Sequence, residues 1–217
     1  MNSRYTGSCV RKNDLRELVT GRLMTDGLID DADDIDRMYF CKYENEASVF
    51  LRNETALKEV IRTDRTCCTG NRVYAAGQPN LAKLHACDYR PEWIFALADE
   101  FRNGSKIHDT TGATHMCILA KGGRTLYVSE DIGRHNAVDK AVGYALLNDI
   151  ALSECILFTS GRVPVDMTEK IIAAGIPVLV SKSVPTAESV ELATTYGLNL
   201  ICRAWPDRYE IFAPVHL

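Results

Sequence analysis

The sequence predicts an α/β protein, because its second half alternates short apolar strands with helices that stop at glycines. The runs 155–159, 177–181 and 199–202 have the length and composition of buried strands, and the segments 164–174 and 185–196 between them have helical periodicity. Such alternation is typical of a parallel sheet with right-handed crossovers. Ligands bind beyond the carboxyl ends of the strands in such sheets, so we expect the functional site there.

The composition is that of a globular protein. The 217 residues are 46% hydrophobic and 25% charged, which is enough to bury a core as one domain or as a domain with a smaller lobe. A formal charge of −4 argues against a nucleic-acid partner. No apolar run approaches the ~20 residues of a membrane span, and no signal peptide is evident. We therefore expect a cytoplasmic protein without a membrane partner.

The first half predicts a helix followed by a hairpin. Apolar residues at helical spacing predict a helix over 14–27, and the acidic run 30–36 is typical of a solvated turn or short helix. The segments 40–43 and 47–51 predict two paired strands. Residues 1–13 carry no clear pattern.

Residues 61–80 lack apolar periodicity and predict a long loop. The loop contains the adjacent pair Cys67 and Cys68, flanked by Arg65 and Arg72. Nearby cations lower the pKa of a thiol, so these cysteines suit a nucleophile or sulfur carrier. The alternative is two ordinary cysteines in a flexible surface loop.

The other cysteines predict neither a disulfide framework nor a metal site. Cys117, Cys155 and Cys202 lie in apolar strand-like runs and are expected in the core. The sequence contains no C-x-x-C pair, so neither a zinc ribbon nor a thioredoxin-like motif is expected.

The middle of the chain predicts a helix and a second hairpin. Apolar spacing predicts a helix from about residue 81 to 101, and strands are expected over 116–120 and 125–129. The polar stretch before His115 suits the lining of a pocket at the start of the first strand. His115 is equally compatible with a histidine at a strand edge.

The stretch SEDIGRHNAVDKAVG, residues 129–143, places charged side chains between a strand and a helix expected over 135–147. Asp139 follows His135 by four residues and can orient its imidazole from the same helical face. Such a cluster predicts a ligand site. The alternative is a helix start with capping carboxylates and a solvated charged face.

The ends of the predicted parallel strands are rich in hydroxyls and cations. The segments 159–162 and 181–183 each lead into a helix, and Arg203 follows the third strand. This pattern predicts a site for a phosphorylated ligand. No G-x-G-x-x-G or P-loop occurs, so several loops together are expected to hold the anion.

Several long blocks resemble one family. EDIGRHNAVDKAVG (130–143), FTSGRV (158–163), residues 173–183 with the following VPTAESVELA, and DLRELVTGRLMTDG (14–27) are similar to the most distinctive blocks of the FdhD family, the formate dehydrogenase accessory sulfurtransferases. The resemblance extends from Asp14 to about Phe212.

This resemblance implies a fold and an activity. The implied fold is cytidine-deaminase-like, a three-layer mixed sheet at 80–217 with a smaller N-terminal α+β lobe at 1–79. The implied homodimer accepts a persulfide from a cysteine desulfurase. It delivers the sulfur to the bis-molybdopterin guanine dinucleotide cofactor of formate dehydrogenase or a related molybdenum or tungsten enzyme. GDP or GMP occupies the same pocket as a mimic.

The resemblance also assigns residues by position. It places the persulfide on Cys68, with Cys67 as the fallback, although Asn71 stands where the family usually has the second cysteine of a C-x-x-C. It also implies that the strand many members carry before the first helix is missing. The residue patterns and the resemblance together predict a cofactor site of Thr111, Gly112, His115, Asp131, Arg134, His135, Asn136, Asp139, Ser160, Gly161, Arg162, Ser181, Ser183, Thr186, Arg203, Ala204, Trp205, Pro206, Asp207 and Arg208.

Two functions other than sulfur transfer are compatible with the predicted fold. A deaminase would share the fold, but its zinc site requires H-x-E and P-C-x-x-C, and neither motif occurs. A protein that binds the pterin–guanine cofactor or GDP without transferring sulfur is the stronger rival, because the cysteine loop departs from the family pattern. Substitution of Cys67 and Cys68 would separate the two functions.

Overall fold

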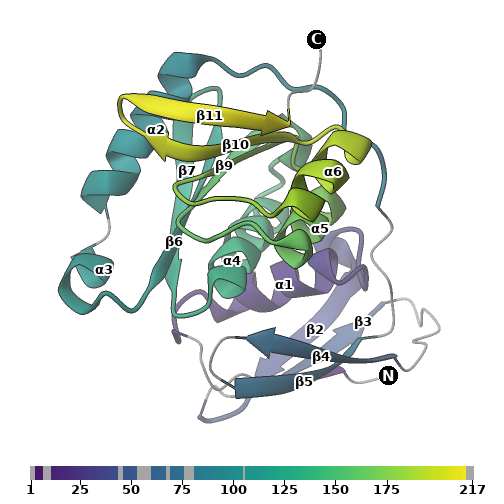
Figure 1. Cartoon of the computed structure of the whole chain (residues 1–217). Helices are drawn as coiled ribbons and strands as arrows, with labels where there is room; N and C mark the ends of the chain where they lie inside the picture. Colours follow the sequence, from purple (N-terminus) through teal and green to yellow (C-terminus); the bar gives the residue numbers. More distant parts are fainter. Residues whose placement is uncertain are drawn as a thin grey trace.

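The main body of the computed structural model is a six-stranded mixed sheet with the order β11-β10-β9-β8-β6-β7 (Figure 1). The structure describes residues 3–6, 11–43, 46–52, 60–66, 69–75, 81–104 and 106–213. Strands β8, β9 and β10 are parallel, whereas β6, β7 and β11 run antiparallel to their neighbours. The strands are β6 (His115–Lys121), β7 (Arg124–Asp131), β8 (Cys155–Thr159), β9 (Val178–Ser181), β10 (Asn199–Trp205) and β11 (Arg208–Ala213).

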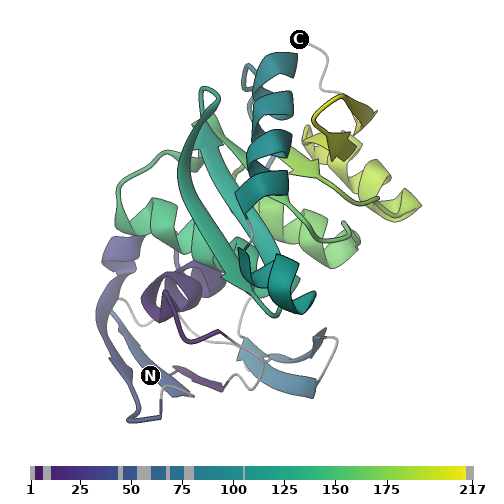
Figure 2. The same cartoon turned by 90° about the vertical axis from the view of Figure 1, so that its left-hand side faces the viewer.

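Helices cover both faces of this sheet, which confirms the predicted three-layer α/β fold. Residues of β6 alternate between the two faces: Cys117 and Leu119 pack with α4, α5 and α6, whereas Met116 and Ile118 pack with α2 (Figures 1 and 2). The helices are α2 (Pro91–Gly104), α4 (Arg134–Leu147), α5 (Val165–Ala173) and α6 (Ala187–Tyr196), with a short 3-10 turn, η2 (Leu152–Glu154), before β8. Within the described ranges, no helix combines the length and apolar character that a membrane span requires.

The N-terminal part forms a small sheet under the helix α1 (Leu15–Thr25), which packs against α4 (Figure 1). Its strand order is β1-β3-β2, and its core includes Leu23 and Val49. The elements are β1 (Ser3–Thr6), η1 (Ala32–Asp34), β2 (Ile35–Phe40) and β3 (Glu46–Leu51). A hairpin is present as expected and its second strand is confirmed, but its first strand is β2 rather than the predicted segment 40–43. The expectation of a missing N-terminal strand is wrong, because β1 pairs with β3. The predicted boundary after residue 79 stays a prediction.

The predicted loop over 61–80 is largely a hairpin instead. Strands β4 (Val60–Thr66) and β5 (Thr69–Ala75) pair in continuous antiparallel register from Val60 and Ala75 to Thr66 and Thr69. Strand pairing depends on backbone hydrogen bonds and does not require apolar side chains at regular spacing. The lack of apolar periodicity therefore led to the wrong prediction of a loop. Cys67 and Cys68 lie outside the described residues.

Two further elements differ from expectation. The helix expected from residue 81 begins only at Pro91, because proline is favoured at the first helical position and disfavours helical geometry in the residue before it. The short helix α3 (Lys106–Thr111) and the edge strand β11 were not predicted.

Candidate functional site

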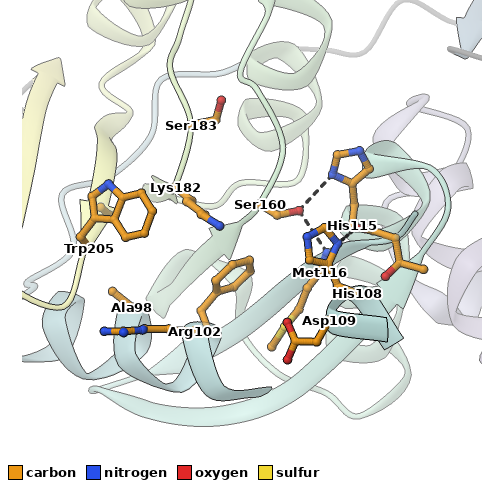
Figure 3. A pocket seen from close by; sticks show the side chains of 13 residues that line it. Ala98, Arg102, His108, Asp109, His115, Met116, Ser160, Lys182, Ser183 and Trp205 are labelled. Carbon is orange, nitrogen blue, oxygen red and sulfur yellow. Dashed lines mark hydrogen bonds between the residues drawn. The ribbon is translucent and has the colours of Figure 1, made fainter. Parts of the chain in front are cut away.

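A cavity of about 320 Å³ opens where β8, β9 and β10 end and β6 begins (Figure 3). It therefore lies at the sheet edge where the parallel strands predict a ligand site. Helices α2 and α3 close its other side. Its lining residues are Ala98, Phe101, Arg102, His108, Asp109, Thr114, His115, Met116, Ser160, Lys182, Ser183, Ala204 and Trp205.

Five of the predicted site residues meet in this cavity although they come from four separate segments. They are His115, Ser160, Ser183, Ala204 and Trp205. In Figure 3, Trp205 faces the cavity from one side and His115 from the other. The cavity is thus lined by an aromatic ring, an imidazole and hydroxyls.

Ser160 holds the ring of His115 in place. The Ser160 Oγ accepts a hydrogen bond from the Met116 backbone N–H at 3.1 Å, and it lies 3.0 Å from His115 Nδ1. A hydroxyl has one proton and two lone pairs, so the Oγ that accepts from the backbone can either donate to Nδ1 or accept from it, according to the tautomer of the ring. In either case the contact fixes Nδ1 against Ser160 and leaves Nε2 as the nitrogen available to a ligand.

The surroundings of His115 keep its imidazole neutral. Burial lowers its pKa below the usual value, and the positive charges of Arg134 and Arg162 lower it further, as do the nearby ionisable rings of His108 and His135. An anion that enters the cavity would offset this repulsion. The gathering of cations around an uncharged histidine is therefore suited to a ligand that brings negative charge.

His108 is held in one tautomer by the backbone. Its Nδ1 lies 2.7 Å from the carbonyl oxygen of Thr114, which can only accept, so Nδ1 carries the proton. In the neutral ring Nε2 is consequently an acceptor. His108 and His115 thus present two imidazole rings to the same cavity.

Cations surround the ring of Trp205. The Nζ of Lys182 lies 5.2 Å from the ring centroid, and the guanidinium carbon of Arg208 lies 5.9 Å from it. Trp205 is 36% exposed, so part of its ring remains open to a ligand. A half-exposed indole beside two cations is a suitable platform for a planar ring that carries phosphates.

Several other predicted residues shape the loops around the cavity. The buried Ser181 Oγ donates to the Gly161 carbonyl oxygen at 2.7 Å and accepts from the Ser183 N–H at 2.9 Å, which ties the loops after β8 and β9 together. Gly161 is close to Arg134, because an ideal Cβ at Gly161 would lie 3.0 Å from the Cβ of Arg134. Thr186 caps α6 through the Ser189 N–H.

The acidic residues of the 129–143 stretch do not face the cavity. Asp139 has no exposed surface, and its Oδ1 lies 2.6 Å from the Nζ of Lys170 and accepts from the Thr25 hydroxyl. The expectation that Asp139 orients His135 is wrong, because Asp166 lies 3.2 Å from the His135 Nε2 instead. This contact lowers the pKa of Asp166.

Asp131 is buried as well, and its carboxylate is fully engaged by protein groups. It pairs with Lys140, whose Nζ lies 2.7 Å from Oδ2, and Asn136 donates to Oδ1 at 2.9 Å. Asp131 and Asn136 therefore brace the turn before α4. The alternative of a solvated charged face is also wrong for Asp131, Asp139 and Lys140, because all three are buried.

The remaining predicted residues do not line the cavity. Thr111 donates to the Ile107 carbonyl within α3, and Gly112 follows with φ of 62°. Arg203 forms an exposed ion pair with Glu210. Pro206 and Asp207 form the turn between β10 and β11.

Sequence reasoning left several lining residues outside the predicted site. Arg102, His108 and Asp109 come from α2 and α3, which tertiary packing alone brings to the strand ends. Lys182 lies between the predicted residues Ser181 and Ser183, so the strand-end pattern was sufficient to include it.

Four of the described thiols, three of them buried, are poor nucleophiles. Burial raises the pKa of Cys155 to about 11 and that of Cys202 to about 12, and it also raises the pKa of Cys117 and Cys87. A thiolate is the reactive form, so these four side chains are unsuited to carry sulfur at neutral pH. Cys117, Cys155 and Cys202 lie in the core as expected.

Known proteins are similar along nearly the whole chain. The sulfur carrier protein FdhD of Streptomyces coelicolor is 43% identical over 113 residues, 51% of this chain and 40% of that protein. The sulfur carrier protein FdhD of Mycobacterium bovis is 31% identical over 218 residues, 90% of this chain and 79% of that protein.

A solved structure shares the fold. The crystal structure assigned as a formate dehydrogenase accessory protein of Desulfotalea psychrophila matches with a TM-score of 0.73 at 27% identity, covering 98% of this chain and 86% of that chain. A family model described as the FdhD/NarQ family matches residues 2–216. The chain belongs to the FdhD/NarQ family.

Proposed function

We propose that this protein is a sulfur carrier for a formate dehydrogenase. It accepts sulfur from a cysteine desulfurase and passes it to the bis-molybdopterin guanine dinucleotide cofactor, which is held as substrate in the cavity at the strand ends. The relatives named sulfur carrier protein FdhD and the similar formate dehydrogenase accessory protein support this role. It would act in the cytoplasm as a homodimer.

The cavity is the observation that carries the proposal. Trp205 beside Lys182 and Arg208 suits a purine ring, and the cations around His115 suit the phosphates of a dinucleotide. In Figure 2 the β4–β5 hairpin, whose strands Cys67 and Cys68 join in sequence, lies below α3, which contributes lining residues to the cavity. In Figure 1 the hairpin lies lower and to the right of α3.

The transfer itself is thiol–persulfide exchange. A thiolate of Cys68, or of Cys67, attacks the outer sulfur of the donor persulfide. A new S–S bond forms on the carrier, the S–S bond of the donor breaks, and the donor leaves as a thiolate. The raised pKa values of Cys87, Cys117, Cys155 and Cys202 make these four thiols unsuited to this step.

Intact-protein mass spectrometry tests the sulfur-carrier step. After incubation with a cysteine desulfurase and cysteine, we expect a gain of one sulfur, about 32 Da, on the peptide containing Cys67 and Cys68. The variant C67A/C68A is expected to bind GDP normally and to gain no sulfur. An unmodified peptide in the wild type, with GDP binding intact, would refute the carrier role.

A cofactor chaperone that does not transfer sulfur is the second candidate. It is favoured by Asn71, which stands where the resemblance implies a second cysteine. A chaperone with C67A/C68A should still support an active dehydrogenase, whereas a sulfur carrier should not. The dehydrogenase activity of cells that contain only the double variant distinguishes the two functions.

A further inference from the structure

Lys140 is a lysine without any exposed surface in the first half of α4. Its Nζ lies 2.7 Å from Asp131 Oδ2, 3.0 Å from the carbonyl oxygen of Arg11 and 3.2 Å from Asn13 Oδ1. The removal of a lysine from water is costly, and partners on two separate segments compensate for it. Lys140 therefore joins the chain before α1 to the end of β7 and to α4.

The carboxylate of Asp131, the partner of Lys140, also holds backbone groups of two segments. Asp131 Oδ2 also accepts from the backbone N–H of Arg11 at 3.1 Å, and Oδ1 accepts from the backbone N–H of Gly133 at 3.1 Å. Gly133 immediately precedes Arg134, the first residue of α4. The carboxylate thus sets the turn from which Arg134 reaches Gly161 and the surroundings of His115.

A second path runs from the same segment to the wall of the cavity. The Nη1 of Arg11 lies 3.5 Å from Glu130 Oε2, and Glu130 Oε1 accepts from the hydroxyl of Thr114 at 3.3 Å. Thr114 lines the cavity, and its carbonyl oxygen holds His108. The network around Lys140 therefore reaches the cavity wall directly at Thr114, and it also holds the turn before Arg134, whose charge acts on His115.

We propose that Lys140 and Asp131 form a positioning pair for the cavity. They hold the turn before Arg134 and, through Arg11 and Glu130, the residues Thr114 and His108 in the geometry that binds the nucleotide part of the cofactor. The pair touches no ligand itself, because both side chains are fully buried. This inference rests on the proposed function, since it assumes that the cavity binds that nucleotide.

A second buried ion pair supplies a matched control. Lys170 and Asp139 are joined at 2.6 Å, and they link α5 and α4 to Thr25 of α1, but neither they nor Thr25 line the cavity. The double variants D131N/K140M and D139N/K170M therefore make the same chemical change at two buried pairs. If general destabilisation were the only cause, the two double variants would lose GDP affinity to a similar extent.

The experiment measures GDP affinity by isothermal titration calorimetry and the imidazole resonances of His108 and His115 by NMR. For D131N/K140M we expect affinity to fall about tenfold and both resonances to shift. For D139N/K170M we expect affinity within about twofold of the wild type and unshifted resonances. Equal affinities of the two double variants would overturn the inference. If wild-type protein fails to bind GDP, the proposed function fails instead.

A milder variant tests the same inference if D131N/K140M does not fold. E130Q weakens the link between Arg11 and Thr114, and we expect it to lower GDP affinity about threefold and to shift the His108 resonance. Its control is E100Q on α2, whose carboxylate likewise accepts a threonine hydroxyl, that of Thr125. An E130Q protein that matches E100Q in affinity and spectrum would contradict a positioning role.

Discussion

Gly21 of α1 and Gly143 of α4 bring the backbones of their helices into direct contact. An ideal Cβ on Gly21 would lie 2.7 Å from the backbone nitrogen of Gly143, and a Cβ on Gly143 would lie 2.7 Å from the backbone nitrogen of Gly21. Each would lie closer still to a carbonyl oxygen, of Asp139 and Glu17 respectively. Only glycine at both positions permits this close crossing, which attaches the N-terminal helix to the main body.

We expect G143A to destabilise the protein by at least about 3 kcal/mol, because the new methyl group meets rigid backbone of α1. At an exposed helical site the same change would stabilise by about 1 kcal/mol. The free energy of unfolding in urea checks this. The control is G104A, whose Cβ would approach only the flexible end of Met116, at 3.1 Å. Equal stability of G143A and G104A would contradict the rigid contact.

The single variant K170M is expected to cost about 3 kcal/mol, because it leaves the buried carboxylate of Asp139 without its cation. Asp139 Oδ2 already has no hydrogen-bond partner among the described residues, so little remains to compensate the charge. The double variant D139N/K170M should regain a large part of the loss. A double-mutant cycle in urea measures this coupling, and strictly additive effects would show that the pair contributes nothing.

Stability should depend on pH through His115. Its pKa is lower in the folded protein than in the unfolded chain, so the unfolded state takes up a proton first as the pH falls below about 6.5. As the pH falls from about 6.5 to the pKa of His115 in the folded protein, the free energy of unfolding of the wild type should therefore decrease relative to that of H115N. Above pH 7.5 the difference in free energy of unfolding between the two proteins should stay constant. The asparagine of H115N keeps a polar group near the position of the His115 Nδ1, so the contact with Ser160 can be retained. Urea midpoints of both proteins from pH 8 to 5 check the prediction, and parallel curves would refute it.

Trp205 should contribute to nucleotide binding through its ring. We expect W205A to weaken GDP binding about tenfold or more, and W205F to retain most of it, because stacking of a base on an aromatic side chain contributes about 1–3 kcal/mol. Pyrophosphate lacks a base, so its affinity should be unchanged in W205A. Calorimetry with both ligands checks this. An equal loss for GDP and pyrophosphate would place the defect at the phosphate side of the cavity.

Local patterns predicted most of the main domain. The strand 155–159 coincides with β8, and the helix expected over 135–147 begins one residue earlier, at Arg134. Apolar periodicity reflects which face of a helix or strand is buried, and in these segments the apolar residues are the ones that pack in the core. Strands β4, β5 and β11 were missed because they pair through the backbone while carrying many polar side chains.

The candidate site was predictable only in part. Ser160, Ser183 and Trp205 were found because the carboxyl ends of neighbouring strands must meet at one edge of the sheet. His108 and Asp109 escaped because α3 reaches that edge through tertiary packing, which no local pattern records.

The sequence by itself determined the strand and helix alternation, the sheet edge that bears the cavity and the family blocks, because each depends on residues close together in the chain. Only the tertiary structure decided which charges face a ligand. Asp131 and Lys140 neutralise each other within one stretch, but both also need Arg11, and Asp139 needs Thr25 and Lys170, which are distant from them in the sequence. The burial of a charge requires such partners, and only folding brings them together.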